Sequence, residues 1–120
     1  MKVILNEIDS VLYVDTDVLF LSPVDDMWNN FGRMNSSQIA AIGQDNFRAD
    51  DHYPLRAKHP YVKPYGVNAG VLLMNLTRMR AFNWTKHLDS TLSKHRKSIV
   101  FPDQDIINII FHNNTGQFYF

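Results

Sequence analysis

VLYVDTDVLFL, residues 11–21, places an acidic segment between two apolar runs. The first run, residues 11–14, is continuous and rich in β-branched side chains, which predicts a strand covered on both faces. Asp15, Thr16 and Asp17 interrupt this strand, and the run at residues 18–21 is expected to resume it. The acidic pair therefore stands at a break in a buried strand.

Strand patterns alternate with helix patterns along the rest of the chain. Short apolar runs typical of buried strands lie at residues 39–42, 71–75 and 117–120, and helix patterns lie at residues 22–32, 77–97 and 102–111. Ser22 before Pro23 is a helix start signal, as are the proline and carboxylates at 102–105. We expect one α/β domain with a mostly parallel buried sheet flanked by helices.

The composition excludes several classes of function. The chain has 120 residues, room for one domain at most, and its twelve basic and twelve acidic residues give a net charge of zero. No basic excess exists to attract nucleic acid or an anionic membrane. The absence of cysteine excludes disulfides, iron–sulfur clusters, cysteine-bound zinc and a thiol nucleophile.

The chain carries no recognisable targeting segment. No apolar run approaches the ~20 residues of a membrane span, and residues 1–5 are too short for a signal sequence. We therefore expect no membrane contact by this segment itself. Four Asn-x-Ser/Thr triplets, the acceptor pattern of N-linked glycans, nevertheless point to a lumenal history; they begin at Asn35, Asn75, Asn83 and Asn113.

The acidic segment at residues 15–17 is the first candidate site. Alternate residues of a strand point the same way, so Asp15 and Asp17 can converge on one ion where the strand breaks. Carboxylate oxygens suit Mg²⁺ or Mn²⁺, which water and a substrate phosphate would complete. Such a metal would turn a diphosphate into a better leaving group. A strand-end turn with two solvated aspartates remains the alternative.

Two other polar segments are candidates on weaker grounds. Asp103 and Asp105 follow a proline and have the ordinary explanation of a helix cap, whereas Gln104 between them is less easily explained by capping. Asn68, before Ala69 and Gly70, is either a turn residue or a ligand-binding residue. The five histidines show no metal-binding spacing.

Three segments in this order form a known pattern: LYVDTDVL at residues 12–19, NAGVLLMN at 68–75 and DQDIIN at 103–108. Together they resemble the GT-A glycosyltransferases of family 8. Over nearly the whole chain, the sequence resembles in particular the glucoside xylosyltransferases of that family. The resemblance implies a partial GT-A fold, which is Rossmann-like and binds nucleotide-diphospho-sugars.

The resemblance also implies roles for individual residues. The family transfers a sugar from a nucleotide diphosphate with retention at the anomeric carbon, assisted by Mn²⁺ or Mg²⁺. Asp15 and Asp17 would bind the metal and, with Thr16, the diphosphate. The donor or acceptor sugar would contact residues 68–70, that is Asn68, Ala69 and Gly70. Asp103 would bind sugar hydroxyls and Gln104 would lie near the reacting carbon, so these two are the expected catalytic residues, with front-face displacement as the mechanism.

For the glucoside xylosyltransferases, the resemblance implies UDP-xylose as donor and O-linked glucose on EGF-like repeats as acceptor. It also implies a type II membrane protein of the endoplasmic reticulum or Golgi lumen. Family members carry uridine-binding strands before this region and a segment with a third metal ligand after it. We therefore expect residues 1–120 to form a single incomplete catalytic domain with little activity alone.

Three alternatives remain at this stage. The chain could belong to another family 8 transferase that uses a UDP-hexose, as glycogenin does. Residues 15–19 also loosely resemble the loop of aspartyl-phosphate phosphatases, in which the first aspartate is the nucleophile. Finally, the tyrosine- and histidine-rich residues 52–65 could bind sugar or protein in a module without catalytic activity.

Overall fold

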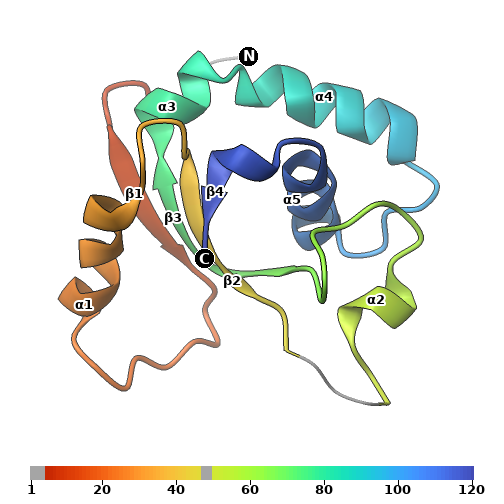
Figure 1. Ribbon diagram of the computed structural model, residues 1–120, viewed down its shortest axis with the longest axis horizontal. Helices are drawn as coiled ribbons and strands as arrows, with labels where there is room; N and C mark the ends of the chain where they lie inside the picture. Colours follow the sequence, from red (N-terminus) through yellow and green to blue (C-terminus); the bar gives the residue numbers. More distant parts are fainter. Residues whose placement is uncertain (1–4, 47–49) are drawn as a thin grey trace.

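The computed structural model describes residues 5–46 and 50–120. A four-stranded sheet lies at its centre, with α5 on one side and α1 beside β1 on the other (Figure 1). The elements are β1 (Ser10–Val14), α1 (Val24–Trp28), the 3-10 helix η1 (Asn29–Arg33), β2 (Ala40–Gln44), α2 (Tyr53–Arg56), β3 (Val67–Asn75), α3 (Leu76–Ala81), α4 (Trp84–His95), α5 (Pro102–Asn113), η2 (Thr115–Gln117) and β4 (Phe118–Tyr119). The helix and strand patterns of the sequence are thus largely confirmed.

The direction of the strands differs from the expectation. The sheet order is β1-β3-β2-β4. β3 runs antiparallel to both β1 and β2, and the pairing of β2 with β4 is parallel. The expected mostly parallel sheet is therefore wrong for these pairs. An apolar run shows that a strand is buried, but it carries no information on the direction of its neighbours.

Two other local expectations are also wrong. Residues 18–21 form no strand, and Leu19 and Leu21 are 80% and 91% exposed, because no neighbouring strand of the described chain pairs with this segment. β1 is an edge strand whose residues are half-buried or exposed, so it is not covered on both faces. Ser22 makes no cap, since α1 begins after Pro23 without a side-chain cap bond.

The main core lies between the sheet and the helices α4 and α5. Val67, Ala69 and Leu72 of β3 pack there with apolar residues of β2, β4 and α5, among them Ile110 and Phe111. A smaller cluster around Met34, Ala41 and Leu73 covers the opposite face. No helix in the described ranges is long and apolar enough to cross a membrane.

β3 leaves its ladder with β2 at the NAG segment. Ile42 pairs with Leu72 and Gln44 pairs with Val67, so residues 68–71 of β3 face Gly43 alone. The pairing with β1 continues without a break to Val14 and Val71. This irregularity frees the polar groups of residues 68–70 from the β2 ladder, at the end of β1 that carries Asp15.

Candidate functional site

The end of β1 holds Asp15 in a defined position. The Asp15 N–H donates to the Gly70 carbonyl oxygen at 2.9 Å, and the Asp15 carbonyl accepts from Val18 N–H at 3.3 Å, closing a turn. The Tyr13 hydroxyl donates to Asp15 Oδ1 at 2.7 Å. Asp15 is therefore partly buried and oriented, whereas Thr16 and Asp17 are exposed in the turn.

Asn68 and Gly70 meet Asp15 at this point. Gly70 N–H donates to Asn68 Oδ1 at 2.8 Å. A Cβ on Gly70 would lie 3.0 Å from Asn68 Oδ1 and 3.4 Å from Asp15 Oδ2. The glycine thus leaves room for two polar side chains to approach the same backbone. Ala69 contributes only its backbone here, because its side chain lies in the main core.

Asp103 approaches the same end of β1 from the first turn of α5. Tyr13 and Asp103 both line a cavity of about 290 Å³ between the sheet and helices α4 and α5. The hydrogen bond to Asp15 and the charge of that carboxylate raise the pKa of Tyr13, and the charge of Asp103 adds a smaller contribution in the same direction. The first and third motifs of the sequence are therefore close enough to interact electrostatically.

Gln104 is held by a residue that the sequence analysis missed. Its Nε2 donates to Asp45 Oδ2 at 2.8 Å. Asp45 directly follows β2, just as Asp15 directly follows β1. A carboxylate at the end of a predicted buried strand is the sequence feature that could have marked Asp45 as a candidate site residue. No hydrogen bond in the described ranges joins Asp103 or Gln104 to Asp15, Asp17 or Asn68, so the motifs share one region without forming one network.

Asp105 is a buried structural carboxylate. Its Oδ2 accepts from the N–H groups of Val100 at 2.6 Å and Phe101 at 2.8 Å, just before α5. Its Oδ1 accepts from the Tyr53 hydroxyl at 2.7 Å and lies 3.1 Å from His59 Nε2. Burial acts to raise the pKa of Asp105, but these hydrogen bonds outweigh it and leave the pKa below its ordinary value.

Asn108 completes the attachment of residues 53–67 to α5. Its Oδ1 accepts from the N–H groups of Val62 and Val67, and its Nδ2 donates to the carbonyls of Val67 and Gln104. One turn further along, His112 Nδ1 lies 2.8 Å from the Tyr61 carbonyl. The segment that the sequence offered as a possible binding loop is thus fastened to the helix that carries Asp103 and Gln104.

Asp15 and Asp17 could supply only some of the oxygen ligands that Mg²⁺ or Mn²⁺ requires. Asp15 and Asp17 offer carboxylate oxygens beside a turn, and Asp15 Oδ2 accepts no hydrogen bond within the described residues. In residues 5–46 and 50–120, no group of three or more His, Cys, Asp or Glu side chains could hold a metal ion. A bound Mg²⁺ or Mn²⁺ would therefore take its other ligands from water, substrate or further protein groups.

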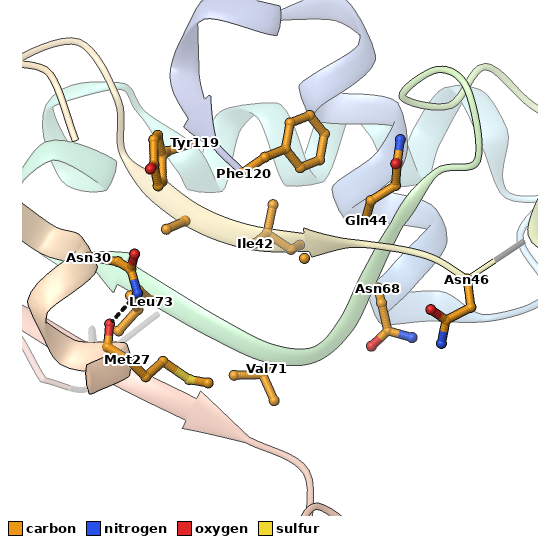
Figure 2. Close-up of a pocket in the computed structure, with 12 residues that line it drawn as sticks. Met27, Asn30, Ile42, Gln44, Asn46, Asn68, Val71, Leu73, Tyr119 and Phe120 are labelled. Atoms are coloured by element: carbon orange, nitrogen blue, oxygen red, sulfur yellow. Dashed lines mark hydrogen bonds between the residues drawn. The ribbon is translucent and has the colours of Figure 1, made fainter. Parts of the chain in front are cut away.

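A second cavity lies on the opposite face of the sheet. It measures about 450 Å³, with apolar walls from β2, β3 and the C-terminal residues Tyr119 and Phe120. Asn46, just after β2, and Asn68 of β3 both line this cavity, as Figure 2 shows. Asn68 thus lies at one edge of this apolar hollow as well as beside Gly70 and Asp15.

The comparison of sequences identifies a family. The model of glycosyl transferase family 8 matches residues 1–118. Human glucoside xylosyltransferase 1 is 43% identical over 95% of the chain, and mouse glucoside xylosyltransferase 2 is 41% identical over 95%. The chain spans 29% and 28% of the lengths of these two proteins. A LARGE-like glycosyltransferase of Caenorhabditis elegans is 25% identical over 93% of the chain.

Solved structures support the same fold. Apo mouse xyloside xylosyltransferase 1 superposes with a TM-score of 0.68 at 20% identity, covering 95% of this chain and 45% of that one. The galactosyltransferase LgtC, solved in complex with donor and acceptor sugar analogues, gives a TM-score of 0.65 at 28% identity and covers 86% of this chain and 36% of LgtC. The α/β fold of GT-A type is therefore confirmed.

Proposed function

Because the chain belongs to glycosyltransferase family 8, we propose that the whole protein is a retaining UDP-xylose:glucoside α-1,3-xylosyltransferase. Its donor would be UDP-xylose and its acceptor O-linked glucose on EGF-like repeats. The observation that carries this proposal is the identity of 38–44% to vertebrate glucoside xylosyltransferases over at least 95% of the chain. The 25% identity to a LARGE-like protein is much lower.

We further propose that residues 1–120 are the part of a larger catalytic domain that carries its three motifs. The chain spans only 29% of human glucoside xylosyltransferase 1, which leaves ample length for the uridine site and a third metal ligand. The exposed edge of β1 and the exposed side chains of Leu19 and Leu21 are consistent with further protein packing against this end.

Asp15 and Asp17 would hold Mn²⁺ or Mg²⁺ against the diphosphate, with Thr16 beside it. When bound, the metal would neutralise charge on the departing diphosphate. The Tyr13 hydroxyl fixes one oxygen of Asp15 at 2.7 Å and leaves the other for the cation. The backbone pairing with Gly70 keeps Asp15 at the end of β1. Contacts with β1 and β3 thus orient the Asp15 carboxylate.

The sugar would lie between residues 68–70 and the first turn of α5. Asn68 and the backbone of Ala69 and Gly70 would contact the donor or acceptor sugar, and Asp103 would accept hydrogen bonds from hydroxyl groups. Gln104 would lie near the anomeric carbon; an active-site mutant of LgtC with glutamine replaced by glutamate fits such a role. The acceptor hydroxyl would attack from the face that the phosphate leaves, while the phosphate accepts its proton.

The first prediction concerns the metal-dependent donor site. The 120-residue chain should bind UDP weakly, because the proposed uridine site lies outside it, and only with Mn²⁺; Asp15→Ala/Asp17→Ala should weaken this binding by more than ~100-fold, to below detection. Loss of a residue that merely supports a metal ligand costs about 10–100-fold in metal affinity, so loss of two direct ligands should cost more. Isothermal titration calorimetry measures this, with UDP-xylose and UDP-glucose as further titrants to identify the donor.

The matched control is Asp25→Ala/Asp26→Ala, which removes two exposed carboxylates in the first turn of α1. This variant should bind UDP as the unmodified chain does. Equal loss in both double variants would show a general effect of charge and contradict the assignment of Asp15 and Asp17. A folded chain that binds no UDP would show that this segment alone lacks a donor site.

We propose the endoplasmic reticulum or Golgi lumen as the location of the whole protein, because four acceptor triplets for N-linked glycans occur in the chain. Its proposed type II membrane topology rests on the similarity to the glucoside xylosyltransferases. The structure shows that two of these asparagines differ in exposure. Asn75 is partly buried and its side chain accepts from Arg78 N–H to cap α3, whereas Asn83 is exposed before α4. On secretion from animal cells, mass spectrometry should find a glycan at Asn83 and none at Asn75; the reverse pattern would contradict this.

A further inference from the structure

Asp45 and Gln104 form a polar pair that the roles above do not explain. Gln104 Nε2 donates to Asp45 Oδ2 at 2.8 Å across a separation of 59 residues in the chain. Both residues are partly buried, so solvent screens the contact less than it would on an open surface. The pair joins the end of β2 to the first turn of α5.

The backbone of each partner is fixed by other contacts. Asp45 N–H donates to the Gly66 carbonyl at 2.9 Å, and Asp45 Oδ1 accepts from Asn46 N–H at 2.8 Å. Gln104 N–H donates to Asp103 Oδ1 at 2.8 Å, and the Gln104 carbonyl accepts from Asn108 Nδ2 at 3.0 Å. What remains for the Asp45 carboxylate to determine is the orientation of the Gln104 amide.

A carboxylate only accepts hydrogen bonds, whereas the two ends of a primary amide differ, since the nitrogen donates and the oxygen accepts. Asp45 therefore selects the orientation in which Nε2 faces the carboxylate and Oε1 is turned away from it. Oε1 accepts no hydrogen bond from the described part of the chain. It is the end of Gln104 that can accept from a sugar hydroxyl or face an electron-poor anomeric carbon.

We propose that Asp45 is a positioning residue of the transfer reaction, which orients the Gln104 amide so that its oxygen faces the donor sugar. The role of that oxygen rests on the proposed function, whereas the orientation itself does not. Asp45 acts through Gln104 and need not touch the substrate. Removing it leaves the amide free to rotate, so its oxygen spends less time in the orientation that the sugar requires.

The orientation is tested by NMR on the ¹⁵N-labelled 120-residue chain. The Gln104 side-chain amide signals are assigned by their loss in Gln104→Leu. In Asp45→Ala both protons should move to the shifts of a free amide and exchange with water at least ~10-fold faster, because the bond to a charged acceptor is lost. Asp45→Asn has a single acceptor oxygen, for which Asn46 N–H and the Gln104 amide compete, so it should shift the Gln104 signals in the same direction as Asp45→Ala.

Asp51→Ala is the matched control, since Asp51 is an exposed carboxylate that pairs with Arg56 at 3.3 Å. It should leave the Gln104 signals unchanged. Unchanged amide signals in Asp45→Ala would overturn the proposal. If that variant does not fold, the unmodified chain decides: absence of a nuclear Overhauser contact between the Gln104 amide protons and the Asp45 β-protons would also overturn it.

Calorimetry with Mn²⁺ then separates positioning from scaffolding. Asp45→Ala should bind UDP within ~2-fold of the unmodified chain but lose ~10-fold of the additional affinity that xylose gives UDP-xylose, because only the sugar contact depends on Gln104. Equal losses for UDP and UDP-xylose would indicate a scaffold role and overturn the proposal. A folded unmodified chain that binds no UDP would contradict the donor site proposed for this segment, while the NMR result would still decide the orientation.

Discussion

Replacing Asp105 by alanine should lower the free energy of unfolding of the chain by about 3–5 kcal/mol. Removing a buried acceptor leaves each of its donors unpaired at a cost of about 1–3 kcal/mol, and Asp105 accepts from several donors. Asp105 is 1% exposed, and its carboxylate contacts Tyr53 and His59 and the backbone N–H groups before α5. Without it, these donors lose their acceptor in the interior and the segment at 53–67 loses one of its attachments to α5.

The buried contact with His59 adds to this expectation. Its Nδ1 lies 2.9 Å from the Pro60 carbonyl and its Nε2 lies 3.1 Å from Asp105 Oδ1. Both partners only accept hydrogen bonds. Asp105→Ala would therefore leave the buried His59 ring without its carboxylate partner, at the cost of an unpaired polar group in the interior.

The same network makes stability depend on pH in a defined direction. The pKa of Asp105 is lower in the folded chain than its ordinary value, so the unfolded chain binds a proton more readily. The contribution of Asp105 is thus complete above about pH 4, the ordinary range of an aspartate, and is lost as the pH falls further. Tyr53 and His59 are the titratable side chains in contact with it.

Urea unfolding followed by circular dichroism measures both effects. The stability of the unmodified chain should fall more steeply between pH 5 and pH 3 than that of Asp105→Asn, which cannot titrate at this position.

Tyr53→Phe serves as a milder variant and should lower the free energy of unfolding by about 1.5–3 kcal/mol, the value of a hydrogen bond to a charged group. Asp89→Ala, on the exposed face of α4, should change stability by less than ~0.5 kcal/mol. Equal effects of Asp89→Ala and Asp105→Ala would contradict the buried role of Asp105.

The apolar patterns of the sequence predict which segments are buried, and they place β2, β3, α4 and α5 close to where the structure has them. They cannot predict strand direction, and they suggest a strand at 18–21 that has no partner to pair with. Burial of an apolar run is a local property, whereas pairing depends on residues far away in the chain. β1 illustrates the difference, because residues 11–14 form the expected strand but at an edge of the sheet.

Some residues of the candidate site can likewise be predicted from the sequence, whereas others are revealed only by contacts between distant parts of the chain. Asp15, Asn68 and Gly70 can be found from the sequence because short motifs carry them, and the structure brings these three together. Asp45 belongs to no motif, and its contact with Gln104 joins residues 59 positions apart. The buried function of Asp105 is equally hidden, since an aspartate after a proline has the ordinary explanation of a helix cap. Tertiary partners decide such roles, and a single sequence does not reveal them.

Gly66→Ala should also destabilise the chain strongly, by about 2–5 kcal/mol. Gly66 has a φ of +83°, a conformation that costs an L-residue about 1–2 kcal/mol. A Cβ there would lie 2.5 Å from Cδ1 of Tyr53 and 3.1 Å from Oδ1 of Asn108. Tyr53 is 1% exposed and its hydroxyl is bound to Asp105, so the ring cannot move aside without breaking that bond, and such overpacking adds about 1–3 kcal/mol.

Gly116→Ala is the matched control, because a Cβ at Gly116 would meet nothing within 4 Å and its φ is not positive. Thermal unfolding should show a loss of stability for Gly66→Ala alone; equal midpoints for the two variants would contradict the constraint. The change should also reach the donor site, since the Gly66 carbonyl accepts from Asp45 N–H and Asp45 holds Gln104. If Gly66→Ala folds, the Gln104 amide signals should move while those of the α1 residues remain in place. The conformation of one glycine would then set the position of the Gln104 amide through two consecutive hydrogen bonds.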